Sequence, residues 1–85
     1  MGVNEVKEVI VFGTPDCGAC KIAMKQLRPL VDNLRYVDCE SNHGLANKSR
    51  IQSVPTILVM NDKEEVARYT GFSRTIQTAL LSKLN

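Results

Sequence analysis

Stretches rich in apolar and β-branched residues alternate with amphipathic stretches along this chain of 85 residues, which limits the fold to a few α/β arrangements. Residues 8–12, 35–39, 56–60 and 66–70 predict strands. Segments in which apolar residues have the spacing of a helix follow the first, second and fourth of these runs. The predicted order is β-α-β-α-β-β-α, a four-stranded mixed sheet flanked by helices, in which the first three elements make a right-handed crossover.

The helix boundaries are marked by proline and by capping residues. Apolar residues recur at i, i+4, i+7, i+8 and i+11 between Ala23 and Leu34, as on one face of a helix. Pro29 lies inside this pattern and should kink the helix or end it early, because proline cannot donate the helical hydrogen bond. Residues 45–50 predict a short second helix, and Ser73 is a suitable N-cap for the last one.

The composition is that of one small globular domain, which we assign to residues 1–85. Hydrophobic residues make up 44% and charged residues 24%, which excludes a disordered or fibrous chain. The net charge of +2 is too small to drive nucleic-acid binding, so no nucleic acid is expected as a partner. No run approaches the roughly 18 apolar residues of a membrane helix, and the N-terminus lacks a signal-peptide pattern. We therefore expect a cytoplasmic protein without a membrane partner.

Three cysteines suggest a reactive pair, Cys17 and Cys20, with Cys39 as a spare thiol. Cys17 opens the first predicted helix, where free backbone N–H groups and the positive end of the helix dipole favour a thiolate. Cys20 follows one turn later on the same face, at a separation that suits a disulfide. Gly18 and Ala19 are small and leave Cys17 open to a large partner.

The chain resembles the thioredoxin family from Val9 to Lys83. The resemblance rests on the Cys-Gly-Ala-Cys sequence at 17–20 combined with Ser-Val-Pro-Thr at 53–56, in the same order of strands and helices. It implies that Pro55 follows a cis peptide bond and packs against the dithiol. It also implies that Val54 offers its backbone groups to an extended substrate.

Four positions depart from the thioredoxin pattern. Val11 stands where thioredoxins have a buried aspartate, and Gly13 and Asp16 replace two tryptophans. Pro15, two residues before the first cysteine, looks more like glutaredoxins, although the residues with which glutaredoxins hold glutathione are not visible. The resemblance therefore implies a minimal thioredoxin-like protein of hybrid thioredoxin and glutaredoxin type.

The activity implied by this resemblance is reduction of protein disulfides by dithiol exchange. Cys17 would attack a substrate disulfide, and Cys20 would resolve the mixed disulfide. No bound cofactor is expected. Electrons would come from a thioredoxin-reductase-type donor that uses NADPH, ribonucleotide reductase would be one acceptor, and the protein would be a monomer.

Two alternatives belong to other functional classes. Cys17, Cys20, Cys39 and His43 have the spacing of a zinc-binding module. Strong helix formers after Cys20 argue against the tight turn that such a module needs. The other alternative is a thioredoxin-fold interaction subunit whose dithiol is not used.

Several other polar side chains receive no firm role from the sequence. Lys21, Lys25 and Arg28 recur at i, i+4 and i+7 along one helix face, which usually marks a solvated face and less often one that steers a partner. Asp38 at the end of a predicted strand is left unassigned. Cys39 is interpreted as a bystander rather than a regulatory thiol, because free cysteines are commonly buried and inert.

Overall fold

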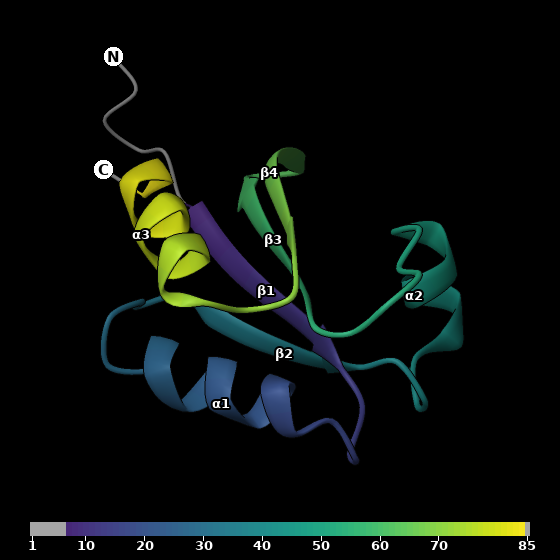
Figure 1. Ribbon diagram of the computed structural model, residues 1–85. Helices are drawn as coiled ribbons and strands as arrows, with labels where there is room; N and C mark the ends of the chain where they lie inside the picture. Colours follow the sequence, from purple (N-terminus) through teal and green to yellow (C-terminus); the bar gives the residue numbers. More distant parts are fainter. Residues whose placement is uncertain (1–6, 85) are drawn as a thin grey trace.

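The computed structural model describes residues 7–84 as one four-stranded sheet with three helices (Figure 1). The elements in chain order are β1 (Lys7–Gly13), α1 (Gly18–Leu27), β2 (Leu34–Asp38), α2 (His43–Lys48), β3 (Thr56–Asn61), β4 (Glu64–Thr70) and α3 (Arg74–Lys83). This order is the predicted β-α-β-α-β-β-α. Within the described range, no helix has the length and apolar character needed to cross a membrane.

The sheet is mixed, with the strand order β2-β1-β3-β4. β1 runs parallel to β2 and antiparallel to β3, and β3 and β4 form an antiparallel hairpin. The parallel pair is joined through α1, as expected for a crossover connection. β1 and β3 are therefore the central strands, and the carboxyl end of β1 leads directly to the start of α1.

Side chains that alternate along the central strands form two separate cores. On one face, Val9 and Val11 of β1 pack with Ala23 and Leu27 of α1, and Leu80 of α3 joins the same cluster. In Figure 1, α2 lies apart from α1 and α3. The second cluster consists of buried residues from β1, β2 and β3: Ile10, Phe12, Val37 and Leu58. Three partly buried residues pack against it: Cys39, Ile51 and Met60.

Helix α1 ends at Leu27, so the stripe that continues to Leu34 does not belong to one helix. Pro29 explains the early end, because it has no N–H to bond with the carbonyl of Lys25. One further turn is held by the N–H of Val31, which donates to the carbonyl of Leu27 at 2.9 Å. Val31 is thereby buried against the same core as α1, while Leu34 begins β2.

Arg68 of β4 holds the segment that leads from α2 to β3. Its guanidinium donates to the carbonyls of Ser49 and Arg50, at 2.7 and 3.3 Å, and also bonds the Glu65 carboxylate at 2.8 Å. This hydrogen bond lowers the pKa of Glu65. Arg50 has a φ of +58°, a left-handed conformation, which reverses the chain after α2. The hydrogen bonds of Arg68 therefore hold the start of the segment that leads to residues 53–55.

Candidate redox site

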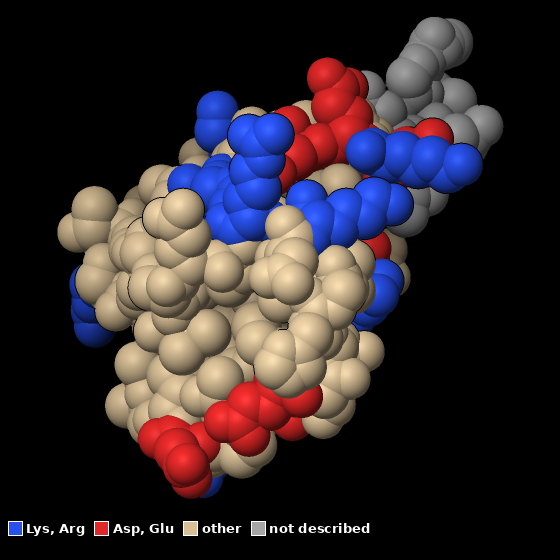
Figure 2. Space-filling model, turned by 90° about the vertical axis from the view of Figure 1, so that its right-hand side faces the viewer, with Lys and Arg blue, Asp and Glu red and all other residues tan. Residues whose placement is uncertain are grey.

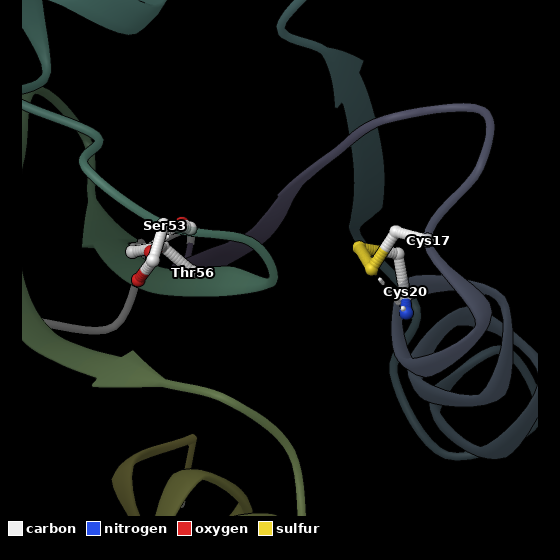
Figure 3. Close-up of a disulfide and its surroundings, with 4 residues drawn as sticks. All are labelled: Cys17, Cys20, Ser53 and Thr56. Atoms are coloured by element: carbon white, nitrogen blue, oxygen red, sulfur yellow. Dashed lines mark hydrogen bonds between the residues drawn. A yellow bond between two sulfur atoms is a disulfide. The ribbon is translucent and has the colours of Figure 1, made fainter.

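Cys17 and Cys20 form a disulfide at the start of α1, with their Cα atoms 5.2 Å apart (Figure 3). Cys17 is the N-cap residue of the helix, with extended backbone angles, and its sulfur accepts a hydrogen bond from the N–H of Cys20 at 3.1 Å. The sulfur thus satisfies one of the free donors at the helix N-terminus. The same donor stabilises negative charge on Cys17 when the pair is reduced.

The two sulfurs differ in their access to solvent. Cys20 is only 1% exposed, whereas Cys17 is partly exposed. Gly18 and Ala19, between them, are both exposed and add little bulk. A large partner can therefore reach Cys17 but not Cys20, which is the asymmetry needed for one attacking and one resolving thiol.

The segment before β3 is drawn among the surroundings of the disulfide in Figure 3. The Val54–Pro55 peptide bond is cis, and the Pro55 carbonyl accepts a hydrogen bond from the N–H of Gly71 at 2.7 Å. Thr56 is buried, and its hydroxyl donates to the Ser53 carbonyl at 2.7 Å. Figure 3, a close-up of the disulfide and its surroundings, includes these two residues on either side of Val54 and Pro55. The backbone is thus tied down on both sides of the partly exposed Val54.

The backbone of Val54 is itself free to bind. Neither its N–H nor its C=O has a hydrogen-bond partner within residues 7–84. Backbone groups in a folded protein are normally paired with protein or with water. A free donor and acceptor on one residue suit an extended peptide, which can pair with both in the manner of an added strand.

A glycine and a tyrosine pack around the buried sulfur. A Cβ atom on Gly13 would lie 2.8 Å from the sulfur of Cys20 and 3.0 Å from Cε1 of Tyr36. Real Cβ atoms essentially never approach neighbours within 3.0 Å, so a side chain at residue 13 would force the disulfide-bonded Cys20 to move. In the sequence, Gly13 differs from the thioredoxin pattern, and nothing there links it to Tyr36. The contact spans two strands, and no local pattern indicates it.

Val11 is apolar and cannot supply a charged group to the site. It is fully buried in the apolar cluster of α1, α3 and the central strands. The position at which thioredoxins have an aspartate is therefore purely apolar in this chain. Residue 11 therefore offers no carboxylate that could exchange a proton with Cys20.

The structure does not support the zinc-binding alternative in the described part of the chain. Within residues 7–84, no three His, Cys, Asp or Glu side chains lie close enough together to hold a metal ion. Cys20 packs on the α1 side of the sheet, while Cys39 packs against the second cluster, beside residues such as Ile10 and Phe12. His43 is exposed at the first turn of α2. The sheet thus separates Cys20 from Cys39, although the spacing of these residues along the chain is compatible with a shared metal site.

Asp38 organises the turn after β2. Its carboxylate accepts hydrogen bonds from the N–H of Glu40 at 2.9 Å and from the hydroxyl of Ser41 at 3.2 Å. Its carbonyl accepts one from the Asn42 side chain at 3.0 Å. These bonds are those of an Asx-type turn, so the structure gives Asp38 a local structural role.

Cys39 should react slowly with alkylating agents at neutral pH. Burial, and then the negative charge of Asp38, raise the pKa of this thiol above its ordinary value of 9.0. Because the thiolate is the reactive form, the rate of alkylation should increase only as the pH rises above the pKa of a free thiol. The oxidised protein, in which Cys39 is the free thiol, can be treated with iodoacetamide between pH 6 and 10 and compared with a cysteine peptide. Modification at pH 7 as fast as that of the peptide would contradict this interpretation.

The side of the molecule that Figure 2 faces has a broad uncharged area. This area lies between charged side chains at the top of the view, where Lys and Arg stand beside Asp and Glu, and a group of Asp and Glu at the lower edge. The loops before α1 and β3 both reach this side in Figure 1. Next to the dithiol and Val54, the uncharged residues Gly18, Ala19, Gln52 and Ser53 are exposed, while the exposed charged residues Asp16 and Lys21 adjoin the two cysteines. Such a surface suits an unfolded or extended protein segment.

An accessible N-cap cysteine, a buried partner one turn later and a cis-proline loop in a β-α-β-α-β-β-α sheet together define a thioredoxin-fold dithiol protein. The Thioredoxin family model matches residues 3–84, so this chain belongs to the thioredoxin family.

Sequence relatives and solved structures agree with this family. Thioredoxin from Bacillus subtilis is 37% identical over 67 residues, which cover 72% of this chain and 64% of that protein. Thioredoxin C-3 from Corynebacterium nephridii is 33% identical over 66 residues, which cover 72% of this chain but only 46% of the relative. This chain thus spans less than two thirds of either relative. The structure of Schistosoma mansoni thioredoxin has a TM-score of 0.82 at 24% identity, with 98% and 83% of the two chains covered.

Proposed function

We propose that this protein is a thiol–disulfide oxidoreductase that reduces disulfides in other proteins. In the reduced form, the Cys17 thiolate attacks one sulfur of a substrate disulfide, forms a mixed disulfide and releases the other substrate sulfur as a thiolate. The Cys20 thiolate then attacks Cys17, releases the second substrate sulfur, and closes the Cys17–Cys20 disulfide. Two electrons pass to the substrate, and protons from solvent neutralise its two thiolates.

The asymmetry of the dithiol is the observation that carries this proposal. Cys17 is partly exposed and receives a hydrogen bond from the N–H of Cys20, whereas Cys20 is almost completely buried. Membership of the thioredoxin family supports the same division of roles. The free backbone of Val54 supports an extended protein segment as the substrate.

The remaining parts of the proposal concern the protein's surroundings. It works in the cytoplasm as a monomer and needs no bound cofactor, because both electrons are carried by the two sulfurs. A thioredoxin-reductase-type protein that uses NADPH returns electrons to the disulfide, and ribonucleotide reductase is among the acceptors. The glutaredoxin-like Pro15 makes glutathione the alternative electron donor.

Reduction of insulin tests the proposal directly. The protein should accelerate precipitation of the insulin B chain when dithiothreitol is present. With NADPH, it should do so when a thioredoxin reductase is added, whereas glutathione with glutathione reductase would reveal a glutaredoxin-like donor. Failure to accelerate insulin reduction even with dithiothreitol would contradict the proposed activity, whichever donor is used.

The amide of Val54 should become protected when a substrate is bound. In a mixed disulfide between a cysteine peptide and Cys17 of the Cys20→Ser variant, which cannot release the peptide, the peptide backbone is expected to accept a hydrogen bond from the Val54 N–H, which has no partner in the free protein within the described residues. Hydrogen exchange of this amide, followed by NMR, should slow by about tenfold or more, the effect of a bond worth roughly 1.4 kcal/mol. The exposed Gln52 amide serves as the control, and equal exchange in the free and bound forms would exclude backbone docking.

A further inference from the structure

A groove of about 710 Å³ lies beside the buried sulfur, between α1 and β2. Its apolar lining includes Pro15, Met24, Pro29 and the ring of Tyr36, and Cys20 contributes to it. Tyr36 is 40% exposed, although aromatic side chains of this size are mostly covered in small proteins. Val54 and Pro55, which we propose to bind the substrate backbone, are not among the residues that line this groove.

Three cations line the groove along one face of α1. Lys21, Lys25 and Arg28 are all exposed lining residues, and none of them forms an ion pair with another residue in the range 7–84. A helix rises 1.5 Å per residue, so Lys21 and Arg28 are about 10 Å apart along its axis. An extended peptide advances about 3.3 Å per residue, so three or four residues span the same length.

From this arrangement we infer that the groove is a docking site for an acidic segment of a partner protein. One bulky apolar side chain of the segment enters between Met24 and Tyr36, and flanking carboxylates pair with the cations of α1. The occupant is a protein segment and not a nucleic acid, because the interior of the groove is apolar and the net charge of the chain is only +2. The proposal does not depend on the redox activity, since binding requires no exchange of sulfur.

A tryptophan peptide provides the test, because the protein contains no tryptophan. The probe is acetyl-Glu-Asp-Trp-Glu-Asp-amide, added to the oxidised full-length protein. Its emission should shift to shorter wavelength as the indole leaves water, and its affinity should fall as salt is added. Chemical shifts in ¹⁵N-labelled protein should change around Met24 and Tyr36 and not at Val54.

Matched variants test separately how much the positive charges and the apolar lining of the groove contribute to binding. The triple variant K21Q/K25Q/R28Q should weaken binding by about tenfold, as expected for three exposed ion pairs. The control K48Q/K63Q/R74Q loses the same number of exposed positive charges elsewhere and should bind within twofold of the wild type. Tyr36→Ser should weaken binding by about fivefold and reduce the emission shift, whereas Leu30→Ser, at an exposed position outside the groove, should not.

Three results would overturn the inference. The first is equal binding by the two triple variants, since overall charge alone would then explain the affinity. The second is equal binding of a probe with Lys and Arg in place of Glu and Asp. The third is tighter binding of single-stranded DNA at the same residues, which would make the surface a phosphate-binding one. Insulin reduction is measured separately, so a failure of docking does not bear on the proposed activity.

Discussion

Replacing Cys17 with serine should reduce insulin reduction to the rate seen without the protein. A serine hydroxyl is not ionised at neutral pH and cannot form the mixed disulfide, so the first step of the exchange is lost. The dithiothreitol-coupled insulin assay measures the effect, and circular dichroism confirms that the variant is folded. Cys39→Ser is the matched control and should retain the wild-type rate, because Cys39 packs on the other side of the sheet from Cys20. Insulin reduction that survives in Cys17→Ser would contradict the role of Cys17 as the attacking thiol, whereas an interaction subunit whose dithiol is not used would show no reduction even as the wild type.

The complementary variant, Cys20→Ser, should trap the intermediate of the same reaction. Attack by Cys17 still occurs, whereas the thiol that releases the product is missing. Mass spectrometry after incubation with an oxidised substrate should show one covalent adduct per chain, located on Cys17. An adduct on Cys39 would contradict the division of roles between the three cysteines.

Substituting Gly13 with alanine should lower the free energy of unfolding by about 1–3 kcal/mol, the usual cost of overpacking a core. The new Cβ would lie 2.8 Å from the sulfur and 2.9 Å from the Cβ of Cys20, a residue that is 1% exposed and held in the disulfide. The side chain that must move is therefore not a flexible surface group. Urea unfolding of the oxidised protein measures the change, which corresponds to a fall in Tm of at least about 4 °C for a domain of this size.

Gly18→Ala is the control for this substitution, and its expected effect has the opposite sign. Gly18 is the first residue of α1, and a Cβ there would have no neighbour within 4 Å. Alanine is favoured over glycine in a helix by about 0.5–1 kcal/mol, so this variant should be as stable as the wild type or more so. If Gly13→Ala is also stabilised, the contact with Cys20 does not constrain the site.

The elements that the sequence predicts correctly are those with local signals. All four strands and three helices occur in the predicted order, and Ser73 caps α3 by accepting a hydrogen bond from the N–H of Ile76. Each of these features depends on periodicity or on residues within one or two turns. The stripe beyond Leu27 is misleading, because Val31 reaches the same core from a turn and Leu34 from a strand.

The placement of Cys39 shows where spacing along the chain is insufficient. Its separation from Cys17 and Cys20 is compatible with a shared metal, yet the face of the sheet on which it packs is set by the pairing of β1 with β2. A shift of one residue in a strand moves every side chain to the opposite face. Sequence spacing carries no information about that register.

By itself, the sequence determined the order of the elements, the reactive pair at the start of a helix and the thioredoxin-like arrangement around Pro55, because each is written in neighbouring residues or a short motif. Only the tertiary structure decided that a side chain on Gly13 would force Cys20 to move, that Tyr36 lies beside Cys20 and that the cations of α1 border an apolar groove. These features join β1, α1 and β2 through packing. Their physical cause is the steric fit between elements, which depends on strand register and helix position and not on any local pattern.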